Sequence, residues 1–233
     1  MSAYPIILSN LESQLVVVIG GGAIAEAKVL SLLDAGAGHV RVISPRLTDA
    51  LAQLAAEARI NWEPRAYRPG DVSEAFMCIA AADDPAINRA VANEARRARV
   101  LVNVVDDPAY CDFYAASVIR RGGFTLSIGT DGQMPTLAAR LRAQLSRGFG
   151  PEYAVLIEIM RELRPTMRER FPDAKKRRRA WRALAEAKLI PLIRAGASRE
   201  AVWERIESIL QEQTGERSRS PAAHDNSREV YRI

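Results

Sequence analysis

The sequence predicts an α/β protein, with a parallel β-sheet covered by helices, followed by a β-hairpin and a small helical domain. In the first half, short apolar runs alternate with segments of helical spacing. Runs rich in Val, Ile and Ala are typical of strands buried on both faces, and their alternation with helices indicates a parallel sheet with crossover connections. After residue 112 the alternation stops, and the chain becomes helical and basic.

Each element of the first half follows from a local pattern. The predicted strands are residues 15–19, 40–43, 60–62, 75–82 and 100–105. The predicted helices between them are residues 23–35, 47–58 and 84–97. In the last of these, Pro85 suits the first helical turn, where its missing N–H costs nothing.

The second half begins with a predicted hairpin over residues 114–129, which turns at Gly122-Gly123. A two-stranded sheet is too small to be stable alone, so we expect its apolar residues to need a partner surface. Ser198 is expected to cap the last helix. The first predicted helix of this half starts at Pro135, and three further helices are predicted over residues 153–163, 174–193 and 199–210.

Composition excludes several classes of protein. No apolar run approaches the ~20 residues that span a bilayer, and the start lacks a secretory signal, so a cytoplasmic protein without membrane contact is expected. Cys78 and Cys111 form no CxxC pair, and His39 and His224 lie far apart. The sequence therefore predicts inert thiols, and no disulfide framework, metal site or histidine-based triad.

A glycine motif follows the first strand. Gly20, Gly22 and Ala25 fit G-x-G-x-x-G/A between a strand and a helix, the pattern of a Rossmann-type dinucleotide site. Such a turn lets the backbone approach a pyrophosphate at the positive end of the helix. The acidic residue that often grips the ribose is absent, and the second strand ends in "VISPR". Ser44 can bind a ribose hydroxyl and Arg46 a 2′-phosphate, so the spacing leaves NAD and NADP both open.

Carboxylates follow the last predicted strand, in "VNVVDDPAYCDF". Asp106 is expected at the carboxyl end of this strand, on the edge where doubly wound sheets bind ligands. Asp-Asp-Pro is also common in turns, and Asp112 could cap the next segment. Spacing alone leaves a catalytic and a turn-forming role open.

Motifs spread over the chain resemble those of the precorrin-2 dehydrogenase family, the N-terminal module of siroheme synthases. These are "VVVIGGGAIAEAK", "CIAAADDPAIN", "VNVVDDPAYCDF" and "SIGTDGQMPTLAARLR", which occur in the family's order. The resemblance is close over residues 4–147. It implies NAD-dependent oxidation of precorrin-2, a tetrapyrrole, to sirohydrochlorin by a homodimer. Some members also insert Fe²⁺ to make siroheme, and the sequence does not separate these members from dehydrogenases alone.

The resemblance also assigns residues. It implies that Asp106 is the catalytic aspartate, a general base that would serve dehydrogenation and chelation alike. The implied cofactor contacts are Gly20, Gly22, Ala23, Ile24, Ser44, Pro45 and Arg46. The implied domains are the dinucleotide-binding domain 1–112, a dimerisation region 113–147, a helical domain 148–212 and a polar tail 213–233, expected to be disordered.

Some features depart from the family or allow another interpretation. The segment "GTDGQMP" replaces a serine pair of the family with Gly129-Thr130, which puts polar substrate contacts there in doubt. Because the chain ends at Ile233, we expect no methyltransferase domain. Residues 161–182 hold ten Lys/Arg against three acids. A solvated helix face explains such a run more often than nucleic-acid binding does, although Arg could also bind the substrate's carboxylates. A non-catalytic NAD-binding or nucleic-acid-binding module is the remaining alternative.

Overall fold

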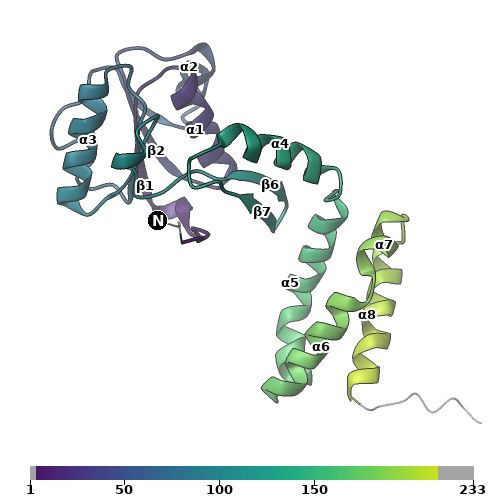
Figure 1. Ribbon diagram of the computed structural model, residues 1–233. Helices are drawn as coiled ribbons and strands as arrows, with labels where there is room; N and C mark the ends of the chain where they lie inside the picture. Colours follow the sequence, from purple (N-terminus) through teal and green to yellow (C-terminus); the bar gives the residue numbers. More distant parts are fainter. Residues whose placement is uncertain (1–3, 215–233) are drawn as a thin grey trace, which may run out of the picture. The chain divides into compact units, whose positions relative to one another are not determined.

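The computed structural model describes residues 4–214 (Figure 1). The chain divides into two compact units. Of the described residues, one unit holds 4–117 together with 129–138, and the other holds 118–128 together with 139–214. No helix among the described residues is long and apolar enough to cross a membrane.

The first unit is built on the predicted parallel sheet, and all five expected strands are confirmed. They are β1 (Leu15–Ile19), β2 (His39–Ile43), β3 (Asn61–Glu63), β4 (Met77–Ala80) and β5 (Leu101–Val104). Their order is β3-β2-β1-β4-β5, and every neighbouring pair is parallel. The chain first moves outward from β1 to β3 and then returns to the other side of β1. This reversal between β1 and β4 creates the crevice where such sheets bind ligands.

Helices cover both faces of this sheet. On one face α1 (Ala23–Asp34) and α2 (Asp49–Ala56) pack on Val16, Val18 and Val42. On the other face α3 (Pro85–Ala98) packs on Val17 and Val102. Because side chains of a strand alternate between the two faces, successive valines of β1 enter different cores. The central strands β1 and β4 therefore read as unbroken apolar runs.

Local capping fixes where α2 and α3 begin. Thr48 accepts a hydrogen bond from the amide of Leu51 (3.3 Å), and Asp84 accepts one from the amide of Ala86 (2.8 Å). Pro85 occupies the first turn of α3, as predicted. Since a cap satisfies amides that a helix leaves unpaired, the first turn of α3 is held firmly beside the end of β4.

Glu94 ties α3 to the long connection before β4. Its carboxylate accepts hydrogen bonds from the amides of Gly70 and Val72, both at 2.9 Å, and from the hydroxyl of Tyr67. Burial alone would raise the pKa of Glu94, but these donors outweigh it and lower the pKa below its ordinary value. The connection between β3 and β4 is thereby fixed to the helix that borders the ligand crevice.

The predicted hairpin is confirmed as β6 (Ser117–Arg121) and β7 (Phe124–Ile128). Part of its apolar surface is covered within the second unit. The ring of Phe124 lies 5.4 Å from that of Phe149 and 4.9 Å from that of Tyr153. These aromatic contacts supply some of the partner surface that the hairpin was expected to need.

Five helices complete the described chain. They are α4 (Pro135–Ser146), α5 (Glu152–Arg170), α6 (Ala174–Glu186), α7 (Leu189–Arg194) and α8 (Arg199–Thr214). Ser198 caps α8 as predicted, by accepting from the amide of Ala201 at 3.2 Å. The helix extends past the predicted end at residue 210. The rest of the predicted tail and His224 lie outside the described residues.

Two helix predictions were wrong in length. The single helix expected over residues 174–193 is two, α6 and α7, separated at Lys188 with φ 53°. An unbroken helix would place Pro191 in its interior, whereas in α7 the proline lies in the first turn. Helix α5, expected to end at residue 163, continues through Pro165. Burial of Leu163 and Met167 on one face offsets the hydrogen bond that the proline removes.

Candidate active site

The turn between β1 and α1 lies at the carboxyl edge of the sheet. The amide of Gly20 donates to the carbonyl of Ile43 (3.0 Å), and the amide of Ala81 donates to that of Ile19 (2.8 Å). Helix α1 begins directly after Gly22, and Ala25, in its first turn, is fully buried. The free amides at this helix start therefore face the crevice between β1 and β4, where an anion would be stabilised.

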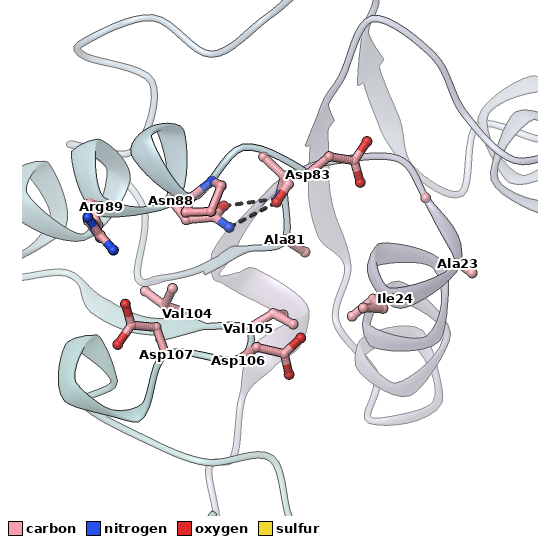
Figure 2. Close-up of a pocket in the computed structure, with 13 residues that line it drawn as sticks. Ala23, Ile24, Ala81, Asp83, Asn88, Arg89, Val104, Val105, Asp106 and Asp107 are labelled. Atoms are coloured by element: carbon pink, nitrogen blue, oxygen red, sulfur yellow. Dashed lines mark hydrogen bonds between the residues drawn. The ribbon is translucent and has the colours of Figure 1, made fainter.

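A pocket of about 500 Å³ occupies this crevice (Figure 2). Its wall comes from three places: the start of α1, the loop from β4 into α3, and the end of β5. Gly22, Ala23 and Ile24 contribute the α1 side. A Cβ added to Gly22 would meet no atom within 4 Å, and the apolar Ile24 is 50% exposed. An open glycine and an uncovered apolar side chain fit a surface that a dinucleotide would cover.

Asp106 stands at the end of β5 and lines the same pocket. Its side chain is exposed, and its backbone is left-handed with φ 59°. This conformation costs an L-residue roughly 1–2 kcal/mol, and aspartate is among the few that adopt it readily. The pairing of the amide of Val105 with the carbonyl of Ala80 (2.9 Å) is the last sheet contact before the chain reverses at Asp106. The buried strand thus presents a carboxylate because the chain turns sharply at the sheet's ligand-binding edge.

Residues 111–113 return alongside β5 and hold this turn. Asp112 donates its amide to the carbonyl of Val102 (2.8 Å), and its carboxylate accepts from the amide of Val102 (3.1 Å). Asn103 donates its side-chain amide to the carbonyl of Phe113 (2.9 Å), and Cys111 contacts both backbone polar groups of Val104 through its sulfur. Asp112 therefore stabilises the turn after β5. Asp107 makes no capping hydrogen bond from its side chain and also lines the pocket.

The implied cofactor contacts Ser44, Pro45 and Arg46 follow the end of β2, and none of them lines this pocket. Ser44 is buried, and its hydroxyl donates to the carbonyl of Arg46 at 2.7 Å. Pro45 and Arg46 are exposed. The loop also touches the glycine turn, because the amide of Thr48 donates to the carbonyl of Gly21 (3.0 Å). A contact from Ser44 or Arg46 to a bound ribose stays a prediction.

Three polar residues of the pocket were given no role from the sequence: Asp83, Asn88 and Arg89. Asn88 is buried, accepts from the amide of Ala82 (3.0 Å) and donates to its carbonyl (2.9 Å), as the dashed lines in Figure 2 show. This pair of bonds fixes the loop that carries Asp83. The signal was present in "DDPAIN", because a helix that follows a parallel strand starts at the ligand-binding edge.

Both cysteines are free thiols. Burial raises the pKa of Cys78 to about 12, and burial also raises the pKa of Cys111. Since the thiolate is the reactive form, these shifts support the prediction that both are inert.

Comparisons with known proteins agree with the two-part organisation. Residues 7–117 match a family described as putative NAD(P)-binding, and residues 152–210 match the sirohaem synthase dimerisation region. Siroheme synthase 1 of Serratia proteamaculans is 34% identical over 195 residues, 84% of this chain and 41% of that protein. Siroheme synthase of Nitrosospira multiformis is 33% identical over 221 residues, 93% of this chain and 46% of that protein. The chain thus spans less than half the length of these relatives.

One solved structure shares most of the fold. The structure titled SirC, precorrin-2 dehydrogenase superposes with a TM-score of 0.71 at 22% sequence identity. The match covers 89% of this chain and 98% of that one. This likeness supports the arrangement of the sheet and helices described above.

Proposed function

The chain belongs to the family of the siroheme synthase N-terminal module, and on that premise we propose that it oxidises precorrin-2 to sirohydrochlorin with NAD. One observation carries the proposal. Asp106 and the start of α1, where a dinucleotide would bind, line a single pocket. A proton acceptor and a cofactor surface on one pocket are what a dehydrogenase needs.

The chain's own residues would orient the reactants and move a proton. Removing two hydrogens from the macrocycle releases one hydride and one proton, and NAD, when bound, supplies the hydride acceptor. The amides at the start of α1, with Gly22 and Ala23, would hold the cofactor's pyrophosphate. The carboxylate of Asp106 would take the proton from the substrate carbon or nitrogen. Because Asp106 is exposed, the desolvation that helps a general base must come from the bound ligands.

An anaerobic assay with purified protein and precorrin-2 tests this function. NADH should form in step with sirohydrochlorin, and kcat/KM should be higher for NAD than for NADP. Family membership supports NAD, whereas the exposed Arg46 at the end of β2 favours a 2′-phosphate. A clear preference for NADP would show that Arg46 dominates, and no reduction of either nucleotide would contradict the function itself.

Chelation is a second candidate, since some family members insert Fe²⁺ into sirohydrochlorin. The metal would be a substrate here, and Asp106 would accept protons that leave the pyrrole nitrogens. Insertion of Co²⁺ or Fe²⁺ into sirohydrochlorin, measured by absorbance in the absence of nucleotide, separates this activity from the first.

A cytoplasmic location stays a prediction from the sequence.

We also propose a homodimer, which the match to the sirohaem synthase dimerisation region supports. Exposed apolar side chains in the second unit, Leu145 and Val155, fit a surface that a second copy would cover. Sedimentation at micromolar concentration should give twice the chain mass of 25.6 kDa. A single species of monomer mass across that range would reject the dimer.

A further inference from the structure

Arg89 stands apart from the rest of the pocket by its charge. Among the described residues that line the pocket it is the one cation, and the same lining holds three carboxylates, those of Asp83, Asp106 and Asp107. Its side chain is exposed, and within residues 4–214 it forms no ion pair. A guanidinium that shares a pocket with three carboxylates and pairs with none of them is available to a ligand.

We propose that Arg89 binds a carboxylate of the tetrapyrrole substrate and so sets which edge of the macrocycle lies over Asp106. The inference rests on the proposed function and names a residue that determines substrate specificity. Precorrin-2 carries eight carboxylates, and a pocket with three acids repels it. Arginine is the side chain best suited to offset this repulsion, because its planar fork can bind a carboxylate through two parallel hydrogen bonds.

The position of Arg89 favours the substrate over the cofactor phosphates as its partner. Figure 2 shows Arg89 on α3 at one side of the pocket, near the end of β5, and Ala23 and Ile24 on α1 at the other side. The pyrophosphate is expected at the α1 side, where the helix start supplies its own amides. Arg89 lies instead on the side of Asp107 and Val104, so a macrocycle placed over Asp106 and extending to this side would bring a carboxylate toward it.

The backbone position of Arg89 follows from two features already described. The Asp84 cap and Pro85 fix the start of α3, and the two hydrogen bonds of the neighbouring Asn88 fix the helix to the loop after β4. Arg89 therefore projects from a rigid turn, so less ordering is required when it binds a carboxylate.

The test measures binding and turnover in the same variants. Uroporphyrin III, a fluorescent octacarboxylate, serves as the binding probe, and precorrin-2 oxidation gives KM and kcat. Arg89→Gln should weaken probe binding and raise the KM for precorrin-2 by about tenfold, with kcat and the Kd for NAD changed less than about threefold. Arg89→Lys should recover most of the probe affinity. Arg97→Gln, which removes a cation from the far end of the same helix, should leave all four quantities unchanged.

The outcomes separate this inference from the proposed function. If Arg89→Gln binds the probe and oxidises precorrin-2 as the wild type does, Arg89 is no substrate contact although the function stands. If its main defect is a raised Kd for NAD, the cofactor is its partner and the inference fails. If the wild type binds the probe through Arg89 but never oxidises precorrin-2, the anion site stands and the proposed function falls. Failure of the wild type to bind the probe overturns the inference.

Discussion

Asp106→Asn should reduce precorrin-2 oxidation by about 10²–10⁴-fold while the fold and the Kd for NAD are retained. Asparagine keeps the size of the side chain and removes the proton-accepting carboxylate. It also tolerates the left-handed backbone at this position, which alanine would not, so the variant separates the chemistry from strain. Single-turnover oxidation under anaerobic conditions, together with NAD binding by fluorescence, measures both quantities.

Asp107→Asn is the matched control, because it makes the same change one residue later on the same pocket wall. We expect its turnover to stay within about tenfold of the wild type, since a carboxylate outside the reacting geometry contributes little. The assignment to Asp106 is wrong if Asp107→Asn is folded but inactive while Asp106→Asn turns over normally. Loss in both variants would indicate that the two carboxylates act together.

Gly20→Ala should have the largest effect on stability. Gly20 has φ 122°, and an added Cβ would lie 2.2 Å from the carbonyl oxygen of Ala81. Both the backbone strain and the clash oppose alanine, so we expect the free energy of unfolding to fall by roughly 3 kcal/mol or more. Urea denaturation followed by circular dichroism measures the loss. An unchanged midpoint would show that β1 and β4 can separate at this edge.

Gly22→Ala is expected to affect cofactor binding rather than stability. Its Cβ would meet nothing and its backbone is not left-handed, so stability should change by less than about 0.5 kcal/mol. The methyl group would stand at the cofactor surface, however, and should raise the Kd for NAD by about tenfold. Two glycines two residues apart would thus separate a structural role from a binding role. NAD affinity equal to the wild type in Gly22→Ala would place the pyrophosphate elsewhere.

Much of the first unit could be predicted from the sequence because its central strands are buried on both faces. Runs such as residues 15–19 have no polar interruption, and glycine or proline marks their ends. The helical part was harder. Periodicity continues from Ala174 into α7, and the break at Lys188 depends on where Pro191 falls within a helical turn.

The site was predictable only where a motif marks it. The glycine turn and Asp106 each stand at the end of a strand, so sequence order places them at one edge. Asn88 and Arg89 look like ordinary polar positions of an amphipathic helix. Only the crossover of α3, with its first turns above the end of β4, brings them to the pocket. The order of strand and helix predicts that α3 starts at the ligand-binding edge, but which of its side chains line the pocket depends on the three-dimensional path of the chain.

The return of residues 111–113 along β5 also affects how the sheet meets other molecules. An open edge strand offers unpaired amides and carbonyls that can template aggregation. Here both backbone groups of Val102 are bonded to Asp112, and the opposite edge, β3, is only three residues long and ends at Glu63, which pairs with Arg41 and Arg65. The segment that holds Asp106 in place therefore also closes the sheet at five strands, which leaves a newly folded neighbour no long, bare strand to extend.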